Sequence, residues 1–334
     1  MRNRNSANLP PQTDRSADSS TLTPPAGSAQ ESTGGAPMGA QMKKKSGVGL
    51  NIMIVFFALV LLGGIGLIAY PTFANWWNSM HASRAVAGYV EQVKDMSGEQ
   101  KKELLDQAHA YNTKLNTLPD RWHLTDEQMD EYNKTLDVTG TGIMGYITIP
   151  KLEVRLPVYH GTEDTVLQIA GGHLAGSSLP VGGAGTHTAV SGHTGLPSAK
   201  LFTGLDSLKE GDTFAFHVLD DTYTYQVDQI RTVLPNEMRD LDFDPNQDYA
   251  TLITCTPYGV NSHRLLVRGH RIPTPAEADE TQYDKADTNR TLVIAGIALA
   301  IVLFILWIIW LIVRRSRKRG RNAVSGTQVK HAGR

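Results

Sequence analysis

The chain has 334 residues, of which 19% are charged, and its 32 basic and 33 acidic residues nearly cancel. This balance argues against a nucleic-acid-binding protein, because such proteins concentrate positive charge for the phosphate backbone. The chain has a single cysteine, Cys255, and therefore cannot form an internal disulfide. The stability of its folded part must come from an ordinary hydrophobic core.

The N-terminal residues 1–48 are rich in Ser, Pro, Gly, Thr and Gln and contain few large apolar side chains. Such a composition buries too little apolar surface to offset the entropy that the chain loses on folding. We expect a disordered cytoplasmic tail.

Two long uncharged runs, residues 49–71 and 292–313, have the composition of membrane-spanning helices. Each is about long enough to cross a ~30 Å hydrocarbon core. Lysines precede the first run and the basic residues of 314–334 follow the second, so the positive-inside rule predicts that both termini are cytoplasmic. A cleaved signal peptide is the alternative for the first run, although the run exceeds a typical signal h-region. In both cases the segment between the runs is exported, and the first reading gives a two-pass protein of the cell membrane anchored in the lipid bilayer.

Residues 72–140 are predicted to form an extracytoplasmic region of helices and a possible lid. Val, Leu and Ala recur at helical spacing within 84–116, and Ser97 with Gln100 has the pattern of a capping box. We expect one or two helices close to the membrane.

From 141 to 275 the sequence consists of short β-rich runs separated by Gly, Pro and Asp. Seven or eight such runs, with short helical patches near 164–169 and 200–208, predict a mainly β fold in which about eight strands form a closed or nearly closed barrel. An acidic linker, 276–291, joins this domain to the second membrane helix. The predicted strands cover residues 145–150, 155–160, 186–192, 213–219, 222–234, 250–255 and 264–272.

Cys255 ends one predicted strand and Arg264 begins the next. If the two strands form a hairpin, both side chains flank the mouth of the connecting loop and can reach one site. A lone cysteine is usually a small buried hydrophobic residue. As a nucleophile it would need a nearby cation or imidazole, because a thiol of pKa ~8.5 is mostly protonated near neutral pH.

Among the eleven histidines, His193 is the strongest candidate for that imidazole. It follows a predicted strand and begins a glycine-containing turn, a position that presents a side chain at the end of a strand. His173, His187, His263 and His270 also fall within the barrel, so spacing alone does not select one. No cysteine or carboxylate spacing completes a zinc site around them, and we expect no metal.

Two stretches, "TLITCTPYGVNSHRLLVRGHR" and "AVSGHTGLPSAKLFTGLDSLKEGD", resemble the sortase family, and in particular the class C, pilin-polymerising sortases of Gram-positive bacteria. The resemblance covers roughly residues 84–275, and the second membrane helix also suits class C. It implies a sortase-type barrel with Cys255 as nucleophile, His193 as general acid and base, and Arg264 as the residue that holds the substrate and stabilises the oxyanion. Thr254 and Thr256 are expected to support the nucleophile by packing or hydrogen bonding.

The resemblance also implies the reaction. Sortases are cysteine transpeptidases that cleave an LPxTG-like sorting signal between Thr and Gly through a thioacyl-enzyme. In class C the acceptor is a pilin lysine amine, so LPxTG-type pilin subunits are both donors and acceptors and surface pili are polymerised without a cofactor. Which protons Cys255 and His193 carry at rest stays open.

Two other functions remain open from the sequence. A housekeeping sortase would anchor single proteins to a cell-wall precursor in place of a pilin lysine. A non-catalytic exported barrel would bind a partner and signal across the membrane.

One class C feature is only partly present. Members usually carry a lid with an Asp-Pro-aromatic motif, the acid near the catalytic arginine and the ring over the thiol. Asp120 and Trp122 match the first and third positions, but Arg121 replaces the proline and its fixed φ is lost. The alternative is an ordinary loop before a helix capped by Thr125 and Gln128.

Overall fold

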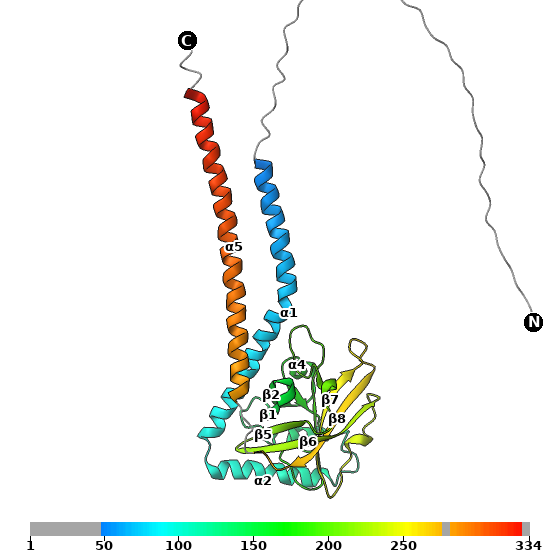
Figure 1. Ribbon diagram of the computed structural model, residues 1–334. Coiled ribbons are helices and arrows are strands. Elements are labelled where there is room, and N and C mark those ends of the chain that lie inside the picture. The colour runs from blue at the N-terminus through cyan, green and yellow to red at the C-terminus, as the bar shows by residue number, and fades with distance from the viewer. Residues whose placement is uncertain (1–47, 276–280, 329–334) are drawn as a thin grey trace, which may run out of the picture. The chain divides into compact units, whose positions relative to one another are not determined.

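The computed structural model describes residues 48–275 and 281–328. The predicted disordered tail, except for its last residue, lies outside the described residues, as do 276–280 of the predicted linker and 329–334. Along the chain, long α-helices near both ends of the described part flank a β-barrel, as the colours in Figure 1 follow. The helices are α1 (Val48–Asp95), α2 (Gly98–Leu115), α3 (Asp126–Lys134), α4 (Asp164–Leu167) and α5 (Thr281–Gln328), with 3₁₀ turns η1 (Pro150–Leu152), η2 (Leu205–Ser207) and η3 (Arg239–Leu241).

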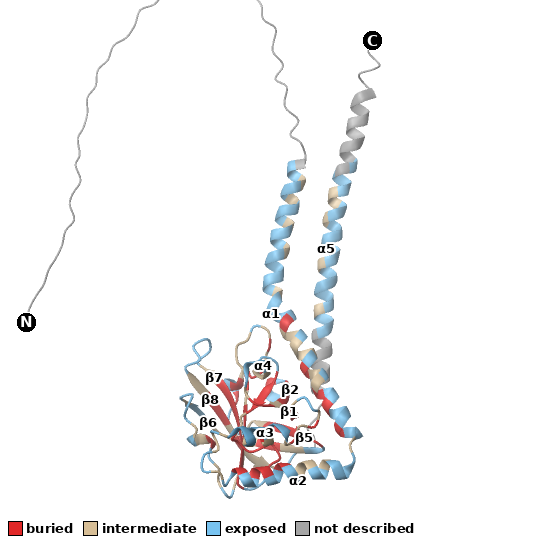
Figure 2. Cartoon of the chain, turned by 180° about the vertical axis from the view of Figure 1, so that it is seen from behind, coloured by how far each residue is buried: buried red, intermediate tan, exposed pale blue. Residues whose placement is uncertain are grey.

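Helices α1 and α5 contain the two apolar runs, and both are long and apolar enough to cross a membrane. The apolar windows of both helices are exposed in the structure (Figure 2). Helix α1 continues past Pro71 to Asp95, although an internal proline removes one backbone hydrogen bond and its ring crowds the preceding turn. The two candidate spans flank the barrel in sequence, which is consistent with membrane anchoring.

Both capping boxes expected from the sequence are formed. At the start of α2 the Ser97 hydroxyl accepts a hydrogen bond from the Gln100 amide (3.2 Å), and the Gln100 side chain accepts one from the Ser97 amide (2.9 Å). Thr125 and Gln128 make the same reciprocal pair at the start of α3. These bonds satisfy amide groups that the first turn of a helix leaves without partners.

The eight strands close into a barrel in the order β1-β2-β3-β4-β7-β8-β6-β5. Neighbours are antiparallel except for two parallel pairs, β2 with β3 and β4 with β7. The strands are β1 (Ile143–Ile149), β2 (Val154–His160), β3 (Gly171–His173), β4 (Thr186–Ser191), β5 (Thr213–Val218), β6 (Asp221–Val233), β7 (Asp248–Thr256) and β8 (His263–Ile272). The sequence prediction missed only β3, which is three residues long and begins with two glycines, so it has no apolar alternation to reveal it.

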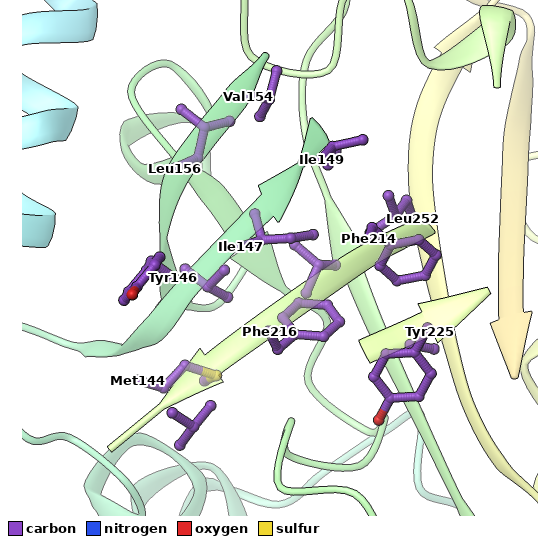
Figure 3. Close-up of a cluster of buried hydrophobic side chains, with 14 of the residues drawn as sticks. Met144, Tyr146, Ile147, Ile149, Val154, Leu156, Phe214, Phe216, Tyr225 and Leu252 are labelled. Atoms are coloured by element: carbon purple, nitrogen blue, oxygen red, sulfur yellow. The ribbon is translucent and has the colours of Figure 1, made fainter. Parts of the chain in front are cut away.

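The main core fills the barrel (Figure 3). Phe214 and Tyr225 stack across the β5–β6 pair with ring centroids 5.7 Å apart, and Phe216 meets Tyr225 edge-on at 6.0 Å. Each such buried ring contributes about 1.5–3 kcal/mol of hydrophobic stabilisation. The helix α1 joins this core through Tyr89, whose hydroxyl donates to the Met144 carbonyl. The barrel is thus a rigid frame on which the strand ends are held in place.

Candidate active site

The β7–β8 hairpin places Cys255 beside Arg264. The two residues are direct partners in the antiparallel ladder, as the hairpin interpretation of the sequence predicts. The Cys255 side chain is half-buried. One guanidinium nitrogen of Arg264 donates to the carbonyls of Asn261 (3.3 Å) and His263 (3.1 Å) in the connecting loop, which orients the side chain.

The parallel β4–β7 pair brings His193 to the same place. Ser191 pairs with Ile253, so two residues further along both strands His193 comes level with Cys255. Past the end of β4 the Gly192 amide still donates to the Ile253 carbonyl (3.0 Å), which holds the chain beside β7 up to His193. Parallel strands present their carboxyl ends at one edge of a sheet, so Cys255 and His193, which are 62 residues apart in sequence, reach the same cavity.

Gly192 is required by packing. A Cβ atom at this position would lie 2.7 Å from the ring of Phe202, a buried core residue. The Phe202 amide also donates to the His193 carbonyl at 3.0 Å. The backbone that carries His193 is therefore fixed both by the strand and by the core.

The thiol, imidazole and guanidinium line one cavity of about 340 Å³. Side chains alternate between the two faces of a strand, so Ser191 and His193, Ile253 and Cys255, and Arg264 and Leu266 point into it as pairs two residues apart. The structure thus brings together the three residues that the sequence singled out. Further lining residues, which the sequence analysis did not name, are Thr162, Asp164, Leu167, Leu174, Val233, Leu234, Pro235, Glu237, Met238 and Leu241.

His173 and His187 occupy sites of a different kind. Both rings are buried, and burial lowers the pKa of His173 to about 3 and that of His187 to about 4, because the protonated form loses its hydration. His187 donates from Nδ1 to the Asp242 carbonyl (3.0 Å) and accepts at Nε2 from the Thr251 hydroxyl (2.7 Å). A ring held neutral in this way cannot carry a proton to a substrate near neutral pH.

The two threonines predicted to support the nucleophile differ in their contacts. Thr254 is buried, and its hydroxyl donates to the Gly192 carbonyl at 2.7 Å, which ties β7 to the residue before His193. Thr256 ends β7 opposite His263. Among the described residues there is no group of three or more His, Cys, Asp and Glu side chains placed to hold a metal ion.

The segment predicted as a possible lid lies in the loop between α2 and α3. The Asp120 carboxylate accepts hydrogen bonds from the Trp122 amide (3.2 Å) and pairs with His123 (2.9 Å), and these contacts lower its pKa, with the His123 hydrogen bond as the main cause. Trp122 packs against a second apolar cluster formed by Ala189, Leu241, Ile253 and Leu266. Three of these four cluster residues also line the cavity.

Comparisons with known proteins agree with this geometry. Residues 147–272 match the Sortase domain family. The crystal structure of sortase C1 from Streptococcus agalactiae is 52% identical, with a TM-score of 0.56, over 57% of this chain and all of that chain. The chain belongs to the sortase family. This sortase also resembles the crystal structure of Sortase C from Streptococcus pneumoniae, with 44% identity and a TM-score of 0.53 over 58% of this chain and 98% of the other.

Curated relatives are more distant. Sortase A of Bacillus anthracis is 30% identical over 135 residues, which is 40% of this sortase and 62% of that relative. The chain therefore spans less than two thirds of this relative's length. The higher identity to the sortase C structures, and the coverage of 98–100% of their chains, support class C membership for this sortase.

Proposed function

We propose that this sortase is a membrane-anchored cysteine transpeptidase that cleaves an LPxTG-like sorting signal between Thr and Gly and transfers the acyl group to a pilin lysine. The observation that carries the proposal is the convergence of Cys255, His193 and Arg264 on one cavity, each at the end of a different strand segment. Similarity to sortase C structures, which covers 57–58% of this chain and 98–100% of theirs, supports the acceptor, because one of them is described in terms of pilin substrate specificity.

The first half of the reaction breaks the peptide bond. The Cys255 sulfur attacks the Thr carbonyl carbon while the thiol proton passes to the His193 imidazole. Negative charge develops on the carbonyl oxygen, and an Arg264 N–H aimed at that oxygen stabilises it by a few kcal/mol. The carbon–nitrogen bond then breaks, the imidazolium gives its proton to the leaving Gly amine, and a thioester remains.

The second half reverses these roles. The lysine amine attacks the thioester carbonyl and loses its proton to His193, and the oxyanion forms again beside Arg264. The carbon–sulfur bond breaks and the departing thiolate regains the proton. The product is an isopeptide bond, and the free enzyme returns with the protons it began with.

The cavity wall suits the donor peptide. Ile253 and Leu266 lie next to Cys255 and Arg264 on the same faces of β7 and β8, and Leu174 and Leu241 extend this apolar lining. Apolar walls with a few convergent polar groups are typical of binding sites that fix a ligand's orientation. We propose that the Leu and Pro of the sorting signal bind here while the Thr carbonyl reaches the thiol.

The two candidate membrane spans suggest where the barrel would act. Anchored by α1 and α5, the barrel would act on the outer face of the cell membrane with both termini in the cytoplasm, where the positive-inside rule places the flanking basic residues. Donor and acceptor pilins emerging from the membrane would meet the cavity there.

The test uses the full-length chain in detergent with an LPxTG peptide and a lysine-containing pilin peptide. We expect an isopeptide product, and a thioacyl adduct on Cys255 detectable by mass spectrometry. Cys255→Ala should abolish both, whereas Ser262→Ala, an exposed change in the same hairpin loop, should retain them. Transfer to a cell-wall precursor amine but not to lysine would indicate housekeeping anchoring, and binding of the peptide without an adduct would indicate a non-catalytic barrel.

A further inference from the structure

Arg121, the residue that departs from the lid motif, is held by contacts from three parts of the chain. Its side chain is only 10% exposed. The guanidinium donates to the Gly176 carbonyl (2.9 Å), the Leu241 carbonyl (3.0 Å) and the Asp242 carboxylate (3.2 Å). It also lies over two aromatic rings, with its central carbon 4.2 Å from the ring centroid of Trp122 and 3.9 Å from that of Phe243.

The backbone at Arg121 approaches the turn after β3 as closely as a glycine allows. Gly176 has φ +91°, and a Cβ there would lie 2.2 Å from the Arg121 carbonyl oxygen and 2.9 Å from the Trp122 ring. A side chain at this position would therefore be strained and would also push the loop away. The local packing at Gly176 thus depends on the loop that carries Arg121.

The two turns that Arg121 contacts also form the walls of the candidate active site. Leu174 lies two residues before Gly176, and Leu241 supplies both a carbonyl to Arg121 and a side chain to the cavity. The turns belong to different connections, the one from β3 to β4 and the one from β6 to β7. Strand β4 contacts both turns, through the Leu174 amide on the Ala189 carbonyl and through His187 on the Asp242 carbonyl. The Arg121 guanidinium adds a direct link from one turn to the other.

We infer that Arg121 is a positioning residue that sets the shape of the cavity by fixing the turn at 174–176 against the turn at 241–243. The kinetic part of this inference rests on the proposed transpeptidation; the structural part does not. Arginine suits the position because its planar fork binds two carbonyls and a carboxylate at once while its faces stack on rings, which the single ammonium of lysine cannot do.

The experiment compares Arg121→Ala and Arg121→Lys with Arg268→Ala in the full-length chain. Arg268 is a matched control because it also makes a two-point ion pair, with Asp228 (3.1 and 3.2 Å), and lies over a ring, that of Tyr249 at 4.1 Å. None of these three control residues lines the cavity. The first readout is the rate of Cys255 alkylation by iodoacetamide, and the second is amide hydrogen exchange of 174–177 and 239–243. The third readout is the KM for the donor peptide.

We expect both Arg121 variants to raise the alkylation rate by about threefold or more and to speed exchange in the two turns, because the walls open more often. The donor KM should rise about tenfold with a smaller change in kcat. Arg268→Ala should leave the alkylation rate and the exchange of both turns at the wild-type values. Unchanged alkylation and exchange in the Arg121 variants, or equal changes in the Arg268 variant, would overturn the inference. A wild-type chain that forms no acyl adduct would refute the proposed function, whereas the alkylation and exchange comparison would still decide the role of Arg121.

Discussion

The start of strand β4 and the stretch just past its end hold the same kind of side chain in opposite surroundings. His187 is buried between β4 and β7 with both ring nitrogens hydrogen-bonded, whereas His193, six residues later, lines a cavity with a thiol and a guanidinium. Burial keeps the first ring neutral, and the strand end exposes the second to a substrate. The chemistry of a histidine in this barrel is therefore set by its distance along the strand.

The largest difference between the two regions should appear in catalysis. His193→Ala removes the proposed proton carrier and should lower kcat by about 10²–10⁴-fold. His187→Gln removes a ring of the same type from the same strand and should leave kcat close to wild type at equal folded fraction. Initial rates of peptide transfer for both variants, with circular dichroism to check folding, measure the contrast. Comparable losses of kcat in the two variants would show that His193 acts only through structure.

The second difference concerns stability against pH. His173 and His187 have pKa values lowered to about 3 and about 4 in the folded chain, while in the unfolded chain they protonate near 6.5. The unfolded state therefore binds more protons below pH 6.5, and stability is complete above that value and is lost as the pH falls toward 4. At pH 5 each ring should destabilise the fold by about 2 kcal/mol relative to pH 7.

Chemical denaturation at pH 7 and pH 5 tests this sign. His187→Gln should reduce the loss between the two pH values by about 2 kcal/mol. Thr188→Val serves as the control, because it removes a buried hydrogen bond to the Ser178 carbonyl without removing a titrating group. The control should cost the same at both pH values. A His187 variant with the full wild-type pH dependence would contradict the assignment.

The smallest expected effect concerns the hydrogen bond that joins Thr254 of β7 to the Gly192 carbonyl just past β4. Thr254→Val removes the hydroxyl that binds the Gly192 carbonyl and should cost about 1 kcal/mol of stability. It should also lower kcat, because the residue before His193 loses an anchor. Thr148→Val removes a buried hydroxyl that contacts His217 elsewhere in the barrel, and should cost similar stability with kcat retained. Equal kcat values for the two variants would mean that the Thr254 bond has no bearing on the site.

The sequence revealed those parts of the molecule that depend on local pattern. Alternating apolar residues marked the longer strands, and the Ser97 and Thr125 capping boxes marked two helix starts. The Cys255–Arg264 pairing followed from a short hairpin, whose register depends on neighbouring residues. The roles of these side chains came from family resemblance.

The remainder depends on contacts between distant segments. Nothing local indicates that β4 runs parallel to β7, although this pairing is what brings His193 level with Cys255. The partners of Arg121 lie 55 and 120 residues away in the sequence. From the sequence alone, an arginine at the proline position of the lid motif therefore indicated only a weaker match to that motif. Asp120 and Trp122 remain predicted lid residues, with the carboxylate paired to His123 and the ring on the second apolar cluster.

The parallel β4–β7 ladder has a consequence for how such an enzyme can diversify. Six consecutive residue pairs fix the distance between the two strands up to the cavity, so the spacing of Cys255 and His193 follows from the body of the barrel. The connections that carry Leu174 and Leu241 lie outside that ladder, so the side chains that they add to the cavity can be replaced without shifting it. A change in these connections can therefore alter which peptide the cavity binds while Cys255, His193 and Arg264 keep their positions.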